Sequence, residues 1–235
     1  YQITSGSLAS GDNIAGSLTR VSGENVSSYQ INRGSVKVMR SNNDNESNYA
    51  ISYTANYLTI TPRTLTITPN DETVTYGDDL PTYSLTYTNR VSGDDIGAVA
   101  VCNYTKYQNR STSGEFPIYV DQASLNPVKD NYNITYNEGT LTVEKRDISI
   151  NLDGDYYITY GDEEPSEYSF VFGNVVNNEE DSLTVSASAS YSRFGTAGEY
   201  TIVISGADYR NYDASFGTAT LYVAKKGIVV KADDV

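Results

Sequence analysis

Apolar residues alternate with threonine or serine along several short stretches of the chain. The clearest stretches are residues 58–61 (Leu-Thr-Ile-Thr), 65–68 (Leu-Thr-Ile-Thr) and 148–152 (Ile-Ser-Ile-Asn-Leu). Alternation with a period of two residues places one face of a β-strand on a core and the other face in water. We therefore predict strands at these positions and turns at the intervening clusters of Asn, Asp and Gly.

Helical patterns are nearly missing from the sequence. No amphipathic stretch with a period of 3.6 residues is longer than about ten residues. The best candidate for a short helical turn is residues 92–96 (Ser-Gly-Asp-Asp-Ile), where a serine or aspartate side chain can act as a cap. The sequence leaves open whether this turn forms.

One phrase of the chain occurs three times. An Asn-Tyr pair followed by a short alternation stands at residues 48–53, 131–136 and 211–216. The second phrase lies 83 residues after the first, and the third lies 80 residues after the second. After each phrase and a further alternation, a basic residue opens a new alternating stretch: Arg63, Arg146 and Lys226.

Other landmarks keep the same spacing. Thr-Tyr-Gly-Asp at residues 75–78 returns at residues 159–162, and Gly-Asp-x-Ile stands at residues 11–14 and again at residues 93–96. Self-similarity at a fixed period is the signature of a tandem array of repeats. The repeat length is therefore a better guide to the domain organisation than the length of the chain.

These landmarks divide the chain into two complete repeats and two fragments. Residues 1–62 form a partial first repeat whose N-terminal part is missing, residues 63–145 a complete second repeat, and residues 146–225 a complete third repeat. Residues 226–235 are the first strand of a fourth repeat. We interpret the chain as a piece of a longer protein, built from units of roughly 80 residues that just sustain a core of their own.

Successive repeats follow one another without a flexible linker. Only residues 61–63, 144–146 and 224–226 separate the last predicted strand of one repeat from the first of the next, and Pro62 has a fixed φ. A Gly/Ser-rich linker would let neighbouring repeats tumble independently, whereas two or three extended residues limit their rotation. We expect the repeats to stand end to end as a semi-rigid rod.

The charge of the chain argues against two classes of partner. Its 16 basic and 30 acidic residues give a net charge of −14, which repels the phosphates of nucleic acids and anionic membrane surfaces. No apolar run approaches the length of about 18 residues that is needed to span a bilayer. We expect neither nucleic-acid binding nor membrane insertion of this segment.

The composition also argues against catalysis. The chain has no histidine and a single cysteine, Cys102. Serine-histidine and cysteine-histidine mechanisms need a side chain that shuttles protons near neutral pH, and zinc sites need several Cys or His ligands. We predict that the chain is not an enzyme and has no cofactor. Its unpaired carboxylates leave calcium binding open, although no loop has the ligand spacing of a dedicated Ca²⁺ site.

The two Tyr-Gly-Asp segments are the most distinctive local motif. A functional interpretation is that their clustered carboxylates perform glycosidase chemistry or hold Ca²⁺. The structural interpretation, which we favour, is a turn in which a strand ends at Tyr, Gly adopts a positive φ, Asp bonds the turn backbone and Pro starts the next extended segment. The residues concerned are Tyr76, Gly77, Asp78, Pro81, Tyr160, Gly161, Asp162 and Pro165.

Tyrosine is unusually abundant, with 22 copies in the chain. Tyrosine combines a flat apolar face with a polar tip, and it suits stacking on sugars or docking on proteins. Many of these tyrosines stand in strand alternations, as Tyr87, Tyr136 and Tyr222 do, where pairing across neighbouring strands also explains them. We favour packing over recognition.

The ordered set of landmarks resembles the MBG repeats of the Tyr-Gly type in large bacterial surface proteins. The set consists of a basic residue opening a strand, Thr-Tyr-Gly-Asp, Gly-Asp-x-Ile, a Gly-x-Tyr-x-Ile strand and a closing Asn-Tyr-x-Ile, and it covers nearly all of residues 1–235. The third repeat departs from it at Ala214, where Ile is usual, and at Phe216, where Tyr is usual. The resemblance implies tandem, mostly β modules of adhesin-like proteins at the cell surface, with no catalytic residue.

Together these observations predict a mainly β chain of tandem, two-layer modules with roughly six to eight strands each. Each module is either an immunoglobulin-like sandwich or a β-grasp-like mixed sheet with at most one short helix. We expect a monomeric, non-catalytic stalk or spacer of an extracellular bacterial protein, secreted or anchored to the cell wall. The alternative is a binding module that recognises mucin, a glycan, or a host or other surface protein through exposed Tyr-rich faces.

Overall fold

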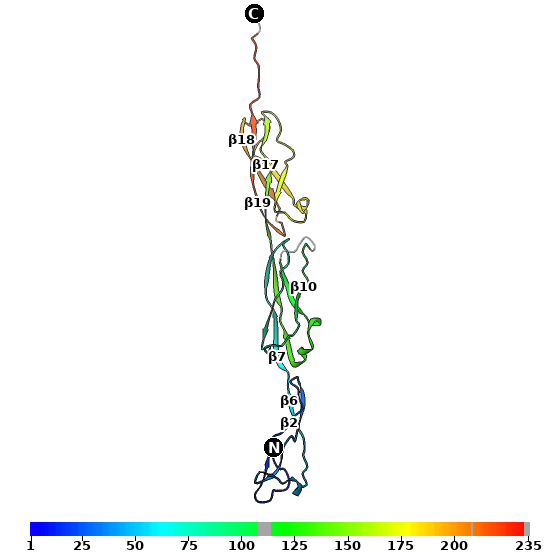
Figure 1. The fold of residues 1–235 in the computed structure, drawn as a ribbon. Coiled ribbons are helices and arrows are strands. Elements are labelled where there is room, and N and C mark those ends of the chain that lie inside the picture. Colours follow the sequence, from blue (N-terminus) through cyan, green and yellow to red (C-terminus); the bar gives the residue numbers. More distant parts are fainter. Residues whose placement is uncertain (108–113, 208, 233–235) are drawn as a thin grey trace. The chain divides into compact units, whose positions relative to one another are not determined.

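The computed structural model describes residues 1–107, 114–207 and 209–232. Strands dominate these residues (Figure 1), and the helical segments among them are short 3₁₀ turns. The prediction of a mainly β chain of tandem modules is confirmed. The 3₁₀ segments are η1 (Glu46–Asn48), η3 (Gln122–Ser124), η4 (Pro127–Asn131) and η5 (Glu180–Ser182).

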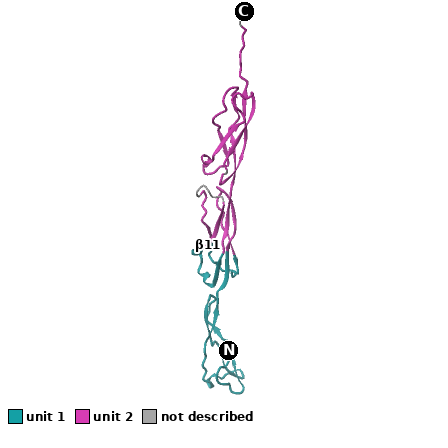
Figure 2. Cartoon of the chain, turned by 180° about the vertical axis from the view of Figure 1, so that it is seen from behind, with its two compact units in different colours: residues 1–67, 87–99, 121–136 teal, residues 68–86, 100–120, 137–235 magenta. Residues whose placement is uncertain are grey.

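The chain forms two compact units (Figure 2). Unit 1 comprises residues 1–67, 87–99 and 121–136, and unit 2 comprises residues 68–86, 100–120 and 137–235. The boundary passes through the predicted second repeat, while the whole of the third repeat lies in unit 2. The repeat boundaries read from the sequence stay a prediction.

The first repeat contains two small antiparallel sheets, ordered β1-β4-β5 and β2-β3-β6. Their strands are β1 (Asp12–Ala15), β2 (Thr19–Arg20), β3 (Ser27–Asn32), β4 (Lys37–Arg40), β5 (Asn43–Asp44) and β6 (Asn56–Ile60). The Asn-Tyr phrase at residues 48–53 forms no strand, and its Ile51 and Tyr53 side chains are exposed. Within the described residues no strand pairs with this phrase, whereas the other two copies each pair in parallel with another strand.

The second repeat also contains two sheets. In the first, ordered β12-β7-β9, the Asn-Tyr strand β12 (Tyr132–Tyr136) runs parallel to β7 (Arg63–Pro69), and β9 (Leu85–Thr88) is the other neighbour of β7. The second sheet is ordered β10-β11-β13-β8. Its strands are β8 (Glu72–Thr75), β10 (Val99–Cys102), β11 (Gly114–Asp121) and β13 (Gly139–Glu144).

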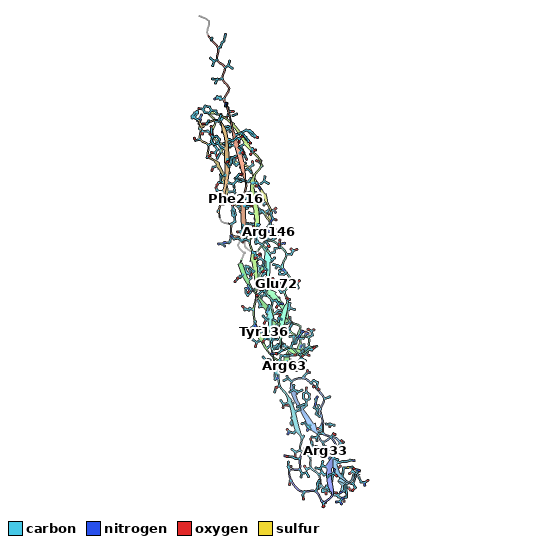
Figure 3. The ribbon with its side chains drawn as sticks, turned by 90° about the vertical axis from the view of Figure 1, so that its left-hand side faces the viewer. Arg33, Arg63, Glu72, Tyr136, Arg146 and Phe216 are labelled. Carbon is cyan, nitrogen blue, oxygen red and sulfur yellow. The ribbon has the colours of Figure 1, made fainter. Side chains whose placement is uncertain are left out.

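The third repeat has the same topology, with seven strands among its described residues. Strand β14 (Arg146–Leu152) lies between β16 (Phe170–Gly173) and the parallel strand β19 (Tyr212–Phe216), and Arg146 and Phe216 mark opposite ends of this pair (Figure 3). The second sheet is ordered β15-β20-β18-β17. Its strands are β15 (Tyr156–Thr159), β17 (Val185–Ala189), β18 (Gly198–Gly206) and β20 (Thr218–Ala224).

The two sheets of the third repeat enclose its core. Ile148 and Ile150 of β14 belong to one cluster of buried side chains with Ile204 of β18. Because alternate residues of each strand point to one face, the polar residues between them face water. Of the two alternatives that the sequence left open, the described residues show two packed sheets and no α-helix, as in a sandwich.

Residues 92–96 form a turn and not a helix. The amide of Asp94 donates to the carbonyl oxygen of Val91 at 3.2 Å, and Gly93 has a φ of +94°. A positive φ is outside the right-handed helical region, so the chain cannot continue as a helix through Gly93.

The connections between repeats are as short as the sequence indicates. Two residues separate β6 from β7, and one residue, Lys145, separates β13 from β14. The described part of the predicted fourth repeat, residues 226–232, forms no strand. Residues 233–235 lie outside the described residues.

Candidate functional site at the contact between successive repeats

A tyrosine-acid hydrogen bond recurs in all three repeats. The hydroxyl of the tyrosine in each Asn-Tyr phrase donates to a carboxylate that stands earlier in the same repeat. The pairs are Tyr49 with Asp12, Tyr132 with Asp94, and Tyr212 with Glu179. A backbone amide of the same loop lies near each hydroxyl: Ala9 at 2.9 Å, Val91 at 3.0 Å and Val176 at 3.4 Å. We call this arrangement the clasp.

The residue before each acid has a positive φ. Gly11 and Gly93 precede Asp12 and Asp94 with φ of +88° and +94°, and Asn178 precedes Glu179 with a φ of +52°. Asparagine is one of the few residues that adopt this region readily, so it replaces the glycine of the other two loops. The third clasp therefore keeps the backbone shape although its Gly-Asp sequence has become Asn-Glu.

The clasp changes the acidity of its members. Burial, followed by the hydrogen bond to Asp94, raises the pKa of Tyr132. Burial, followed by the hydrogen bond to Glu179, raises the pKa of Tyr212. In the first repeat the hydrogen bond from Tyr49 is the main cause that lowers the pKa of Asp12. The raised pKa values hold Tyr132 and Tyr212 in the neutral, hydrogen-donating form.

The clasp of the third repeat also binds the Tyr-Gly turn of the second. The side chain of Tyr76 is fully buried, and its hydroxyl donates to Oε1 of Glu179 at 2.8 Å, while Tyr212 donates to Oε2 at 2.7 Å. Glu179 is only 3% exposed. A buried carboxylate is costly unless donors surround it, and two tyrosines from different repeats supply them here.

Aromatic rings surround this buried carboxylate. The ring of Tyr76 lies edge-on to Tyr212, with centroids 5.6 Å apart, and edge-on to Tyr107, with centroids 6.1 Å apart. Edge-to-face packing of this kind adds to the free energy that is gained from burial alone. One cluster of buried side chains includes Val74 and Leu141 of the second repeat and Ile148 and Ile204 of the third. The apolar core is therefore continuous across the contact.

Gly77 allows the two repeats to approach closely. Its φ is +87°, and a Cβ atom at this position would lie 2.7 Å from Cγ2 of Val176. Real Cβ atoms do not approach that closely, so any larger residue would push the clasp loop away. The glycine of the Tyr-Gly turn thus fulfils both a conformational and a packing requirement.

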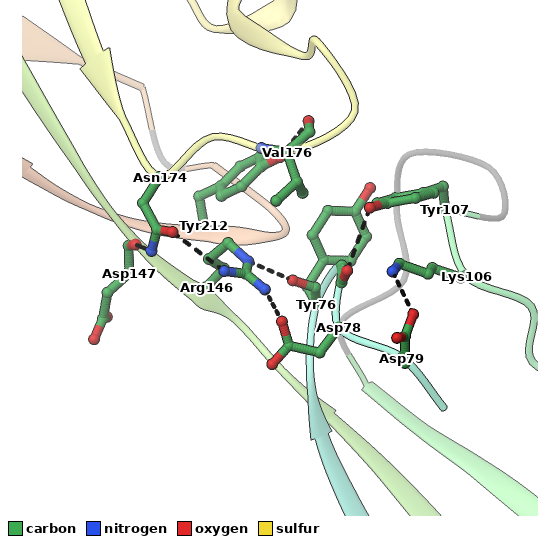
Figure 4. Close-up of polar contacts among 11 residues, drawn as sticks. Tyr76, Asp78, Asp79, Lys106, Tyr107, Arg146, Asp147, Asn174, Val176 and Tyr212 are labelled. Atoms are coloured by element: carbon green, nitrogen blue, oxygen red, sulfur yellow. Dashed lines mark hydrogen bonds and ion pairs between the residues drawn. The ribbon is translucent and has the colours of Figure 1, made fainter. Parts of the chain in front are cut away.

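Arg146 joins the same turn to the first strand of the third repeat (Figure 4). Its Nε donates to the carbonyl oxygen of Tyr76 at 2.7 Å, Nη2 pairs with the carboxylate of Asp78, and Nη1 lies 3.3 Å from Oδ1 of Asn174. The Arg146 side chain is 13% exposed. The planar guanidinium, with donors in several directions, can make these contacts at once, which an ammonium group cannot.

Near each Tyr-Gly turn lies a basic residue that is followed in the sequence by an aromatic residue. In the second repeat Lys106 lies 2.9 Å from Asp79, and the hydroxyl of Tyr107 donates to the carbonyl oxygen of Gly77 at 3.2 Å. The ion pair with Lys106 is the main cause that lowers the pKa of Asp79. In the third repeat the corresponding residues are Arg193, which pairs with Glu163, and Phe194. Tyr107 and Phe194 both have a positive φ, of 63° and 68°.

The Tyr-Gly turn of the third repeat has the same backbone but is open. Gly161 has a φ of +97°, and the nearest atom to an added Cβ is 3.8 Å away. Tyr160 is 39% exposed, and its ring contacts Phe194, which is 63% exposed. Oδ2 of Asp162 accepts from the amide of Thr159 within its own turn. Pro81 and Pro165 follow the two turns in half-buried segments without regular structure.

Residues near the first connection also bond across repeats. Oδ1 of Asn131 accepts from the amide of Val26 at 2.8 Å, and Nδ2 of Asn131 donates to Oδ1 of Asn25 at 3.0 Å. Asn131 is the asparagine of the second Asn-Tyr phrase. The phrase therefore serves two purposes, since its tyrosine holds the clasp and its asparagine reaches the preceding repeat.

The sequence predicts the Tyr-Gly turns but not the clasp. Gly-Asp-x-Ile and Asn-Tyr both recur as phrases, but the sequence does not by itself pair them. Their parallel recurrence was the signal that could have paired Asp12 with Tyr49 and Asp94 with Tyr132. The third acid, Glu179, follows Asn178 instead of Gly, so its loop does not show this signal.

The arrangement of these residues holds the second and third repeats in contact with each other. Among the described residues no three Cys, Asp or Glu side chains gather closely enough to hold a metal ion. Within the same residues, no helix has both the length and the apolar character to cross a bilayer. The polar groups at the contact are used in hydrogen bonds between the two repeats.

Comparison with protein families identifies a match over most of the chain. A family described as the MBG domain (YGX type) matches residues 1–59, 65–142 and 148–222. No curated protein matches the chain. Among solved structures, the fibronectin(III)-like modules of CbhA from Clostridium thermocellum match 72% of this chain and 100% of their own at 8% identity, with a TM-score of 0.27.

Proposed function

The chain belongs to the MBG domain family of the YGX type, and from this premise we propose that its repeats form a non-catalytic stalk or spacer in an extracellular, adhesin-like bacterial protein. In this proposal the repeats hold another part of the protein at a distance from the envelope. Whether that protein is secreted or anchored to the cell wall belongs to the same proposal.

One observation supports the spacer role, namely the buried contact between the second and third repeats. Tyr76 and Gly77 of one repeat are buried under Val176 and Glu179 of the next. Rotation about the single connecting residue, Lys145, would break the hydrogen bonds to Glu179 and expose the Tyr76 ring. A module that holds its neighbour in a fixed orientation needs such a contact, whereas modules that work independently do not.

The family supplies the location in this proposal. The chain resembles the MBG repeats of the Tyr-Gly type in large bacterial surface proteins, and it has a net charge of −14 and a single cysteine. An antibody raised against residues 1–235 should label intact cells of the source organism. Labelling only after the cells have been permeabilised would contradict an extracellular location.

Small-angle scattering tests the spacer role on the whole chain. We expect an extended particle whose maximum dimension does not change between low and high salt. Replacement of Gly77 by Trp should broaden the distance distribution because the indole displaces Val176, whereas replacement of Gly161 by Trp, at an open turn, should not. A compact particle for the unmodified chain would rule the spacer role out.

A second candidate is recognition of mucin, a glycan or a surface protein. The observation that favours it is a stacked pair of tyrosines on the third repeat, Tyr157 and Tyr222, with ring centroids 5.0 Å apart and Tyr157 73% exposed. The equivalent pair in the second repeat is Thr73 and Thr142. Because the second repeat has the same topology with threonines at these two positions, the fold does not require the stacked tyrosines. Exposed tyrosine rings are suited to bind sugars.

A glycan and mucin binding screen separates the two candidates. Saturable binding that is lost in Tyr157→Thr, which restores the residue of the second repeat, would favour recognition. Tyr160→Thr is the matched control, since Tyr160 is an exposed tyrosine outside the stack. Absence of saturable binding to every glycan and mucin in the screen leaves the spacer role as the function of these repeats.

A further inference from the structure

The first two and the last two strands of the third repeat run side by side in the same direction. In one sheet β14 pairs in parallel with β19, through residues 146–150 and 212–216. In the other sheet β15 pairs in parallel with β20, through residues 156–159 and 221–224. Gly217 alone separates β19 from β20, and one residue is too short to reverse the chain. All four strands therefore share one direction.

This arrangement decides how the repeat responds to tension along the chain. Tension would enter the repeat at Lys145, just before β14, and leave it at Lys225, just after β20. Arg146 and Phe216 mark opposite ends of the β14–β19 pair (Figure 3). The first two strands and the last two strands would therefore be pulled in opposite directions along their own axes.

Parallel strands that are pulled in this way resist as a unit. The hydrogen bonds of a parallel ladder are evenly spaced and cross from one strand to the other. A force along the strands therefore loads all of them at once, and they must break nearly together. A hairpin that is pulled apart at its open end loses its hydrogen bonds one after another, at a lower force.

The second repeat has the same pairings. Its first strand, β7, pairs in parallel with β12, and its second strand, β8, pairs in parallel with its last strand, β13. We call these parallel pairs of both repeats the terminal ladders. Residues 61–62 precede β7 and Lys145 follows β13, so tension along the chain would shear these ladders too.

An aspartate extends one end of a terminal ladder in both repeats. In the second repeat the amide of Thr140 donates to Oδ1 of Asp71 at 2.7 Å. In the third repeat the amide of Thr220 donates to Oδ1 of Asp155 at 2.8 Å. Each aspartate stands just before the second strand of its repeat, so its side chain adds a hydrogen bond where the backbone pairing has not yet begun.

The tyrosine of the Tyr-Gly turn extends the other end of the same ladder. The amide of Tyr76 donates to the carbonyl oxygen of Glu144, and the amide of Tyr160 donates to that of Ala224, both at 2.8 Å. Glu144 and Ala224 are the last residues of β13 and β20. The turn thus fastens the second strand to the last strand at the point where tension would leave the repeat.

We propose that these repeats bear tensile load, and that a repeat unfolds under force only after its terminal ladders have sheared. The inference goes beyond the spacer role, because a spacer needs a fixed shape at rest and not resistance to tension. It follows from the strand pairings and does not depend on cell-surface location.

Force spectroscopy of the whole chain, held at its two ends between marker domains of known unfolding force, tests the proposal. Each complete repeat should unfold in one abrupt step. The step should lengthen the chain by about 20–25 nm, because roughly 80 folded residues become an extended chain of about 3.5 Å per residue.

The double variant Asp71→Ala/Asp155→Ala removes the aspartate hydrogen bond from the terminal ladders of both repeats. An interaction that is already broken in the transition state affects the unfolding rate in full. The unfolding rate at a fixed force should therefore rise about threefold to tenfold for both steps. Asp71→Asn/Asp155→Asn keeps an acceptor oxygen at each position and should recover most of the difference.

Tyr168→Phe is the matched control. The Tyr168 hydroxyl donates to Oε1 of Glu164 at 2.7 Å in a half-buried position, and both residues lie between β15 and β16, outside the terminal ladders. Its loss should lower the midpoint of urea unfolding at least as much as Asp155→Ala does. The unfolding rate under force should change by less than about twofold, because this bond is still made when the terminal strands shear.

Two results would overturn the proposal. One is gradual extension of the unmodified chain without abrupt steps. The other is an unfolding rate under force that Asp71→Ala/Asp155→Ala leaves unchanged, or that Tyr168→Phe raises equally. Either result together with an extended particle in small-angle scattering would leave the spacer role standing, so failure of this inference is distinct from failure of the proposed function.

Discussion

The hydroxyl of Tyr76 lies 2.8 Å from Oε1 of Glu179, although 103 residues separate the two in the sequence. Tyr76 directly follows strand β8 of the second repeat, and Glu179 belongs to the clasp of the third. The Glu179 carboxylate, which accepts a hydrogen bond within its own repeat, thus accepts a second one from a tyrosine of the neighbouring repeat. The repeat-to-repeat contact is built onto a feature that every repeat needs for itself.

Loss of the Tyr76 hydroxyl should weaken this contact. In Tyr76→Phe the buried carboxylate of Glu179 keeps only Tyr212 as its tyrosine donor, so the free energy of unfolding should fall by about 1–3 kcal/mol. Tyr160→Phe changes the same motif at the open turn and should stay within about 0.5 kcal/mol of the unmodified chain. Urea unfolding followed by tyrosine fluorescence measures both. Equal losses in the two variants would contradict a role for the contact.

Gly77 should tolerate alanine less well than Gly161. Both positions have a positive φ, which costs alanine about 1–2 kcal/mol, but only at Gly77 does the new Cβ collide with Val176. Gly77→Ala should therefore lose about 1–3 kcal/mol more than Gly161→Ala in thermal or urea unfolding. If the two losses match, the glycine is required for its backbone conformation alone.

Alkaline pH should destabilise the contact. Burial, followed by the hydrogen bond to Glu179, raises the pKa of Tyr76 and of Tyr212 above the value of about 10 for an exposed tyrosine. The unfolded chain releases these protons first, so this contribution to the free energy of unfolding is complete below about pH 10 and declines as pH rises towards the raised pKa values.

The test of this pH dependence is urea unfolding between about pH 8 and pH 12. The slope above pH 10 should be shallower in the double variant Tyr76→Phe/Tyr212→Phe, because two groups with raised pKa values are gone. Tyr160→Phe serves as the control and should keep the slope of the unmodified chain. An unchanged slope in the double variant would show that these two hydroxyls are not the groups responsible.

The strands followed from the sequence because their cause is local. Alternation at residues 65–68 and 148–152 places Leu65, Ile67 and Ile150 on the buried face, and β7 and β14 form there. The Asn-Tyr phrase shows the limit of this reasoning. It is a strand at β12 and β19 but not at residues 48–53, because a parallel strand forms only beside a partner.

The contact could not be predicted in the same way. Alternation reports which residues are buried, but not that Tyr76 is buried by residues of the following repeat. The Tyr-Gly-Asp motif looked sufficient as a turn, and the turn chemistry of Gly77 explains its conformation without Val176. Only the spatial arrangement shows that one glycine satisfies both requirements.

Arg146 supplies the last test, because the basic residue that opens each repeat was recognised in the sequence without a reason for it. In Arg146→Met the carbonyl oxygen of Tyr76 and the amide oxygen of Asn174 each lose their guanidinium donor. The free energy of unfolding should therefore fall by about 1–3 kcal/mol. The ion pair with the half-exposed Asp78 should contribute little of this, because water screens it. Arg146→Lys keeps the charge but not the guanidinium donors, so it should recover only part of the loss. Lys226→Met, at the exposed equivalent position, should change the free energy of unfolding by less than about 0.5 kcal/mol. Full recovery of stability in Arg146→Lys would show that charge alone, and not the guanidinium geometry, holds the two repeats together.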